Sequence, residues 1–150
     1  MINNSKAAPY PVSEEIMTPD GYYIYSVDFD GTLITDNKWP DTNGTPQSEL
    51  ITYLIREQKE GHKIILNTCR TGEHLEAAVA FCKEEGLNFD AINENLPEMI
   101  EAYKSDSRKI SADFYIDDKA IRPEIQNWKM MNEYGMSLRT NSFVTEEGKQ

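Results

Sequence analysis

The chain has 150 residues, of which 39% are hydrophobic, and a formal net charge of −11. This length suits one well-buried core and is too short for two ordinary domains. A surface so acidic repels nucleic acid and anionic lipid, so neither a long nucleic acid nor a membrane is an expected partner. Because no apolar run reaches bilayer length and no secretory signal opens the sequence, we expect a cytoplasmic protein.

In chain order, the sequence opens with a polar segment, residues 1–20, which we expect to form an arm outside the core. Beyond it, apolar and β-branched runs predict strands at 22–29, 62–68, 89–93 and 112–118. Runs of helical spacing, several of them bounded by Pro or Gly, predict helices at 46–61, 72–86, 96–104 and 123–135. Residues 34–46 are rich in Asp, Asn, Gly and Pro, which indicates a loop or small hairpin.

The alternation of strands and helices predicts an α/β protein with a doubly wound, Rossmann-like parallel sheet. We expect a single domain over residues 21–140, followed by a polar tail, 141–150. Ligands of such sheets bind beyond the carboxyl ends of the strands. Three of the expected strands end on reactive side chains, namely Asp28 and Asp30, Thr68 and Arg70, and Asp117 and Asp118. These groups are therefore expected to converge on one crevice.

The aspartates at two of these strand ends would gather up to four carboxylates, whose mutual repulsion would shift their pKa values. A hard divalent cation relieves such repulsion, and an oxygen site that keeps several waters suits Mg²⁺. The pair Asp117–Asp118, taken alone, is more typical of a solvated turn or a helix cap. Its combination with the sequence DFDGT at 28–32 favours metal binding.

Four short motifs resemble those of the haloacid dehalogenase-like hydrolase superfamily, in the same order and at the expected strand ends. They are DFDGTL at 28–33, Thr68 after IILN, a lysine before the last strand, and YIDD at 115–118. The resemblance covers about residues 22–118. It implies a Mg²⁺-dependent phosphatase that hydrolyses a phosphomonoester through an aspartyl-phosphate intermediate.

The resemblance assigns different roles to the two aspartates of the first motif. Asp28 is the nucleophile that attacks phosphorus. Asp30 is the general acid that protonates the leaving oxygen and then the base that activates water. The implied metal ligands are the Asp28 side chain, the Asp30 carbonyl and Asp117, with Asp118 as a neighbouring or water-mediated partner. Which of Asp117 and Asp118 is the direct ligand stays open.

Three further positions are expected around the phosphate. Gly31 permits the turn that lets both acids point to the crevice, and Thr32 helps to shape that turn. By the resemblance, Thr68 donates its hydroxyl to a phosphoryl oxygen. Without the resemblance, Thr68 is simply a β-branched residue at the end of a strand.

A cation is also expected beside the phosphate and the nucleophile. We assign it to Lys109, with Lys104 and Arg108 as the alternatives, because its spacing to the last motif varies within the superfamily. Arg70 follows Thr68 closely enough to contact phosphate, and it can equally pair with a surface acid.

The chain has no room for the cap domain that many relatives insert. The interval 33–68 holds one loop and one helix, and the interval 68–109 holds one helix, one strand and a short helix. We therefore expect a capless protein whose site is covered only by residues 34–46. Such open sites suit large substrates, or take a lid from another subunit of a homo-oligomer.

The identity of the phosphorylated substrate is not evident from the sequence, and three other functions stay open. Capless relatives include phosphatases of nucleotides and of nucleic-acid ends, and the same intermediate can pass its phosphoryl group to an alcohol. A non-catalytic binding protein of this fold is the third alternative. The presence of both Asp28 and Asp30 argues against it.

Several other residues carry less weight. Neither Cys69 nor Cys82 is followed six residues later by the arginine that a cysteine phosphatase needs. His62 and His74 are expected to be structural, at a strand entry and in the first turn of a helix. Trp39 either stacks on a substrate or packs on the sheet edge, and packing is the commoner role.

Overall fold

We analysed a computed structural model, which describes residues 21–138. The predicted arm, residues 1–20, and the predicted tail, residues 141–150, lie outside the described residues. The chain divides into two compact units, the first ending at Asp118 and the second beginning at Lys119. All elements that carry the predicted site belong to the first unit.

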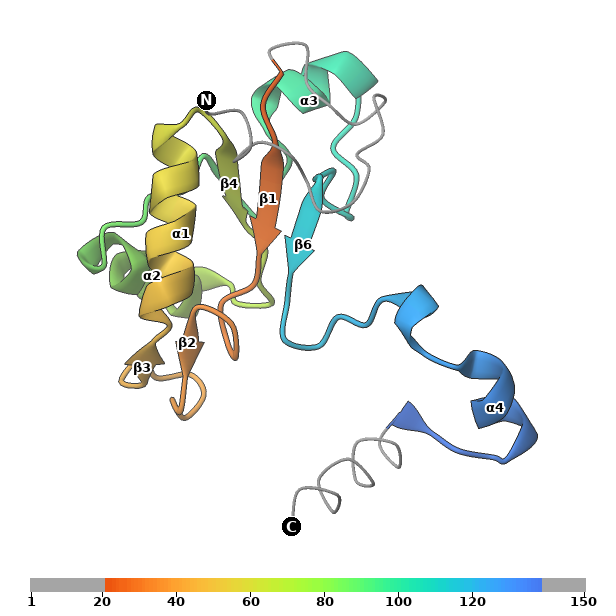
Figure 1. The fold of residues 1–150 in the computed structure, drawn as a ribbon. Coiled ribbons are helices and arrows are strands. Elements are labelled where there is room, and N and C mark those ends of the chain that lie inside the picture. The colour runs from red at the N-terminus through yellow and green to blue at the C-terminus, as the bar shows by residue number, and fades with distance from the viewer. Residues whose placement is uncertain (1–20, 139–150) are drawn as a thin grey trace. The chain divides into compact units, whose positions relative to one another are not determined.

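The first unit is built on a four-stranded parallel sheet, which confirms the α/β class (Figure 1). Its strands lie in the order β5-β4-β1-β6, with bounds Ala91–Ile92, Lys63–Leu66, Ile24–Val27 and Phe114–Ile116. Val27, the last residue of β1, pairs with Leu66 on one side and with Ile116 on the other. The carboxyl ends of three neighbouring strands therefore lie at one edge of the sheet.

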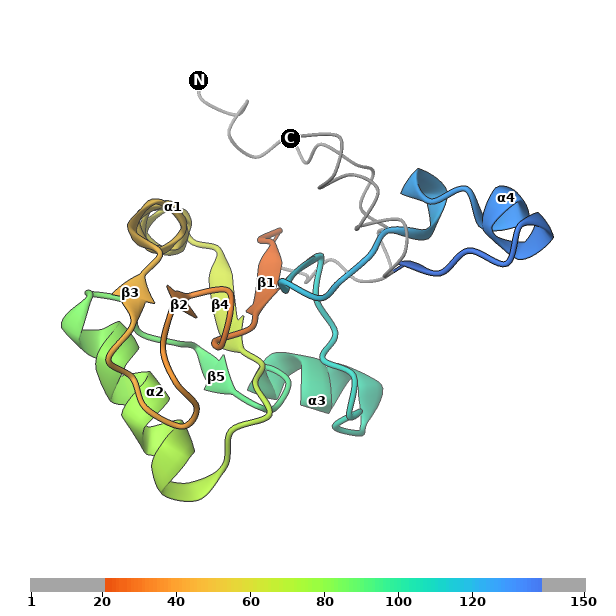
Figure 2. The same ribbon diagram turned by 90° about the horizontal axis from the view of Figure 1, so that it is seen from below.

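Helices cover this sheet on two sides (Figure 2). The helices α1 (Ser48–Lys59) and α2 (Gly72–Glu84) pack against the cluster that includes Tyr25 and Val27. The shorter α3 (Pro97–Tyr103) packs with the cluster that includes Ile24. Alternate residues of a strand face opposite sides of the sheet, so β1 contributes side chains to both clusters. None of the helices in residues 21–138 has both the length and the apolar character that a membrane span needs.

Residues 34–46 form a small hairpin, which was one of the two predicted alternatives. Its strands β2 (Ile34–Thr35) and β3 (Thr45–Pro46) pair antiparallel. The turn is tight at Gly44, where a Cβ atom would lie 2.2 Å from the carbonyl oxygen of Thr35. The hairpin leads directly into α1.

The second unit differs from the single helix predicted at 123–135. It contains a 3₁₀ turn, η2 (Pro123–Ile125), and a separate short helix, α4 (Trp128–Glu133). The side chain of Asn127 accepts a hydrogen bond from the Met130 N–H, which caps α4 and starts a new helix there. The predicted helix was therefore wrong at its centre, because an asparagine cap competes with helix continuation.

Candidate functional site

The turn after β1 places the first pair of aspartates. The Asp28 N–H still donates to the Ile116 carbonyl (2.9 Å), which extends the pairing of β1 with β6 by one residue. The Phe29 carbonyl then accepts from the N–H groups of three following residues, Thr32, Leu33 and Ile34. This compact turn directs the chain away from the sheet immediately after Asp28.

Three carboxylates meet at the ends of β1 and β6. Asp28, Asp117 and Asp118 each offer an oxygen, and these oxygens lie within 4.8 Å of one another. Thr32 links the two strand ends, because its hydroxyl donates to Asp28 Oδ2 (3.3 Å) and accepts from the Asp118 N–H (3.0 Å). The predicted convergence of these residues is therefore present in the structure. Both Asp117 and Asp118 belong to the group.

Gly31 lies in this turn, next to the side chain of Asp118. Its φ of +82° lies in the left-handed region. A Cβ atom built at Gly31 would be 2.3 Å from Asp118 Oδ2. Glycine is required here both for the backbone conformation and for the approach of the Asp118 carboxylate.

The electrostatics of Asp28 reflect this crowding. Its pKa is raised to about 6, first by burial and then by repulsion from Asp117 and Asp118. The Phe29 N–H and the Thr32 hydroxyl oppose the rise without cancelling it. A divalent cation would compensate the charge of all three carboxylates, so the residues present fit an oxygen-ligated metal such as Mg²⁺.

Asp30 lies in the opposite electrostatic environment, although it is only two residues away. The Arg70 guanidinium donates to both Asp30 oxygens, Nε to Oδ2 and Nη2 to Oδ1, each at 2.8 Å. Asn37 adds a third hydrogen bond to Oδ1 (3.2 Å). The pKa of Asp30 is lowered, mainly by the Arg70 hydrogen bonds. This favours the ionised carboxylate, whereas the expected role of general acid requires a proton.

Arg70 is not available to a phosphate in this arrangement. It is fully buried, and its guanidinium also donates to backbone carbonyls, those of Pro40 (2.8 Å), His74 (3.1 Å) and Asp41 (3.3 Å). These bonds and the two to Asp30 use all five donors of an arginine. The phosphate contact expected of Arg70 is therefore replaced by the alternative, an acid partner, although the pair is buried on the arginine side rather than exposed.

Two aromatic rings enclose the same guanidinium. Its central carbon lies 4.8 Å from the centroid of the Phe29 ring and 4.9 Å from that of Trp39. Trp39 also makes an edge contact with the His74 ring, at 5.6 Å between centroids. Trp39 thus packs on Arg70 and not on the sheet edge.

Thr68 and its neighbours form a short loop after β4. The Thr68 N–H donates to Asn93 Oδ1 (2.8 Å), and the Thr68 hydroxyl accepts from the Arg70 N–H (3.2 Å). Asn93, which follows β5 at a φ of 54°, also donates from Nδ2 to the Arg70 carbonyl (3.3 Å). Asn93 was not among the predicted site residues. In the sequence it is marked only by its position directly after an apolar run.

Lys109, the cation expected beside the phosphate, lies against an aromatic ring. The Lys109 ammonium lies 5.3 Å from the centroid of the Tyr115 ring, which attracts it through a cation–π interaction. Among residues 21–138, no hydrogen bond or ion pair joins Lys109 to Asp28 or Asp118. The alternative Lys104 forms an exposed ion pair with Glu101 (2.7 Å).

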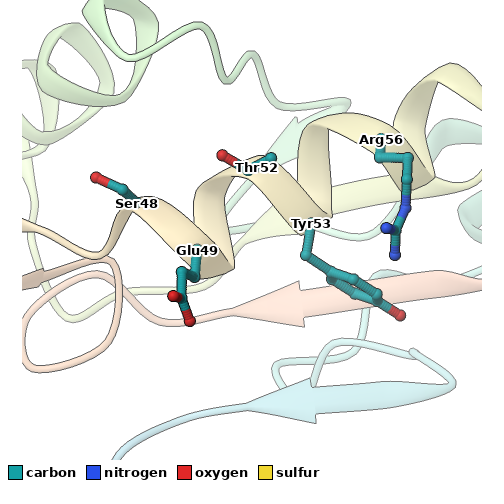
Figure 3. A pocket seen from close by; sticks show the side chains of 5 residues that line it. All are labelled: Ser48, Glu49, Thr52, Tyr53 and Arg56. Atoms are coloured by element: carbon teal, nitrogen blue, oxygen red, sulfur yellow. The ribbon is translucent and has the colours of Figure 1, made fainter.

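A shallow pocket of about 290 Å³ lies elsewhere, along α1 (Figure 3). Its lining residues all belong to that helix, namely Ser48, Glu49, Thr52, Tyr53 and Arg56. Arg56 lies over the Tyr53 ring, with its guanidinium carbon 5.1 Å from the ring centroid. This pocket contains none of the predicted site residues.

The comparisons with known proteins bear on the family. No protein-family model and no curated protein matches the sequence. A solved structure of a conserved protein from Bacteroides thetaiotaomicron is 31% identical, with a TM-score of 0.58. The match covers 79% of this chain and 96% of that one. The chain belongs to the family of that Bacteroides protein. The similarity to the Bacteroides structure supports the fold. An activity can be inferred only from the site residues.

The contact of Gly31 with Asp118 gives a first prediction. We expect Gly31→Ala to lower the melting temperature more than Gly61→Ala does. Both glycines have a positive φ, but a Cβ at Gly61 has nothing within 4 Å, so the control isolates the clash with Asp118. Thermal unfolding followed by circular dichroism measures the difference. Equal losses in the two variants would show that Asp118 moves aside at no cost.

The raised pKa of Asp28 gives a second prediction, for the metal-free protein. Between its ordinary pKa of 3.8 and about 6, the folded chain keeps a proton that the unfolded chain releases, so stability falls as pH rises through this range. Asp28→Asn should remove this penalty. The variant should gain about 1–2 kcal/mol over wild type at about pH 7.5, after allowing for solvent screening, and nothing at about pH 4.

Urea unfolding at the two pH values, with chelator present, measures this difference. Glu84→Gln, which changes an exposed carboxyl on α2, is the control and should show no such pH dependence. A gain for Asp28→Asn that is the same at both pH values would contradict the electrostatic explanation.

Proposed function

We propose that the protein is a Mg²⁺-dependent phosphatase of the haloacid dehalogenase-like superfamily, which hydrolyses a phosphomonoester through an aspartyl-phosphate on Asp28. The observation that carries this proposal is the group of three carboxylate oxygens, from Asp28, Asp117 and Asp118, within 4.8 Å of one another. The group lies directly beside the DFDGTL sequence that resembles the first motif. Carboxylates that gather at the carboxyl ends of parallel strands are otherwise an unfavourable arrangement.

In this proposal the Mg²⁺ would be held by the Asp28 side chain, the Asp30 carbonyl and one of Asp117 and Asp118, with the other of these two aspartates beside it. The metal would supply positive charge that reduces the repulsion between the carboxylates and the phosphate that approaches them. Thr32 keeps the two strand ends in contact through its bonds to Asp28 Oδ2 and to the Asp118 N–H. Thr68, whose hydroxyl accepts from the Arg70 N–H, still has its own proton to donate to a phosphoryl oxygen.

The reaction then proceeds in two steps. An Asp28 carboxylate oxygen forms a bond to phosphorus as the bond from phosphorus to the leaving oxygen breaks, and the leaving oxygen takes the proton that Asp30 carries in this step. Water next attacks the phosphorus of the aspartyl-phosphate, gives its proton to Asp30, and releases inorganic phosphate and the Asp28 carboxylate. The Arg70 ion pair lowers the pKa of Asp30, so Asp30 is a stronger acid in the first step and is ionised before the second, when it takes the proton from water.

We also propose that the fold is doubly wound and capless. Only the β2–β3 hairpin and α1 lie between the first motif and β4, and only α2, β5 and α3 lie between Thr68 and Lys109. Neither interval contains a set of elements that could fold into a separate cap. The hairpin, which contacts Asp30 through Asn37, would then be a partial cover of the site.

The metal gives a third prediction. Excess Mg²⁺ should raise the melting temperature relative to chelator, and the rise should grow with Mg²⁺ concentration. The free energy of unfolding should increase by about 2.7 kcal/mol at a Mg²⁺ concentration of a hundred times the Kd. Asp117→Asn and Asp118→Asn should each weaken this response, and the direct ligand should be the one whose loss weakens it more. Glu124→Gln, which removes the exposed partner of Arg122, is the control. No change with Mg²⁺ at several concentrations would contradict the metal site.

The two steps give a fourth prediction, with nitrophenyl phosphate as an activated substrate. Asp28→Asn should abolish turnover, because an amide does not form the covalent intermediate. Asp30→Asn should lose about 10²- to 10⁴-fold in rate and accumulate phosphoenzyme, because the base for hydrolysis is missing. Intact mass after an acid quench detects the adduct, and circular dichroism confirms that each variant is folded. Activity that survives Asp28→Asn would instead favour direct attack by water.

A further inference from the structure

Trp39 is the most exposed large apolar side chain at the predicted site. Sixty per cent of it is exposed, yet its position is well defined by Arg70 and His74. The Arg70 guanidinium covers one face of the indole and the His74 ring meets it in an edge contact. Because 60% of the side chain is exposed, the part of the indole that neither Arg70 nor His74 contacts is open to a ligand. An exposed tryptophan held in one orientation offers a large stacking surface with little loss of side-chain entropy.

Hydrogen bonds also fix the backbone on both sides of Trp39. Asn37 Nδ2 donates to Asp30 Oδ1 (3.2 Å) and to the Asp41 carbonyl (2.8 Å). Arg70 donates to the carbonyls of Pro40 and Asp41, on the other side of the tryptophan. Asn37 on one side of Trp39 in the chain, and Pro40 and Asp41 on the other, are thus bound to the Asp30–Arg70 pair.

These contacts place the indole on the Asp30 side of the crevice. The ring contacts the guanidinium, the guanidinium binds the Asp30 carboxylate, and Asp30 lies two residues from the proposed nucleophile Asp28. The indole thus forms a wall on the Asp30 side of the nucleophile, which a substrate with its phosphoryl group at Asp28 would meet if it extends past Asp30. Because the five donors of Arg70 are already used, the wall offers a π surface and not a free cation.

We propose that Trp39 is a specificity-determining residue that stacks on a planar aromatic ring of the substrate, so that the substrate class is small phosphomonoesters that carry such a ring. This inference rests on the proposed phosphatase function. The charge around the site agrees with it, since the acidic group Asp28, Asp117 and Asp118 disfavours a second anionic group and accepts an uncharged ring. A nucleoside monophosphate and an arylalkyl phosphate both belong to this class.

The test compares two substrates that differ only in the ring. Benzyl phosphate and cyclohexylmethyl phosphate both release a primary alcohol, but only the first has a planar π system. With Mg²⁺ and the full chain, wild type should have the higher kcat/KM for benzyl phosphate. Trp39→Leu should lower the ratio of the two kcat/KM values by about tenfold, the lower part of the range for loss of one stacking partner. Trp39→Phe should keep most of the preference.

A structural role of Trp39 would lower both kcat/KM values together and leave their ratio unchanged, and that result would overturn the proposal. Trp128→Phe, in the second unit, is the control and should leave the ratio as in wild type. Binding of the same two phosphates, measured by isothermal titration, is a second readout that needs no turnover. If neither compound is hydrolysed, the proposed function fails by itself. Equal affinities for the two compounds in wild type would then reject stacking as well.

Discussion

One buried guanidinium joins the three segments that form the candidate site. Arg70 follows β4, binds Asp30 in the turn after β1, and holds the β2–β3 hairpin through two carbonyls. Burying a cation is costly unless it is paired and all its donors are satisfied. Here a carboxylate, three carbonyls and two aromatic faces meet that requirement. Without this cation, the described side-chain bonds between the hairpin and Asp30 would be reduced to the one from Asn37.

The same pair separates the two aspartates of the turn. Asp28 faces two other carboxylates and is hard to ionise, whereas Asp30 faces a cation and ionises readily. Two carboxyl groups in unlike environments are a common basis for distinct acid and base roles. The order of the two pKa values is the reverse of the one that the expected roles require, because Asp30, the expected proton donor, has the lower pKa and Asp28, the expected nucleophile, has the higher one. Bound Mg²⁺ would favour the anion at Asp28. The negative charge of a bound phosphate would have to raise the pKa of Asp30 before Asp30 could carry a proton.

Local patterns were enough to predict the sheet and the convergence of its strand ends. The buried run at β1, the helical spacing in α1 and the order of the elements each follow from short-range rules, and the parallel register then brings Asp28, Asp117 and Asp118 together. The burial of Arg70 could not be predicted in this way, because its partners lie 30 and 40 residues earlier in the chain. Glu57 is a similar case: it is 1% exposed because the Tyr25 hydroxyl, more than thirty residues away, donates to it (2.7 Å).

The bonds between Arg70 and the hairpin go to backbone carbonyls, and every amino acid has one. Substitutions at residues 40 and 41 that preserve the path of the chain therefore leave the clamp intact. The hairpin is also outside both core clusters except at its first residue, Ile34. Natural variation can thus alter the chemistry of this wall without disturbing the turn that carries Asp28, and relatives with the same catalytic groups could diverge in the compounds they accept.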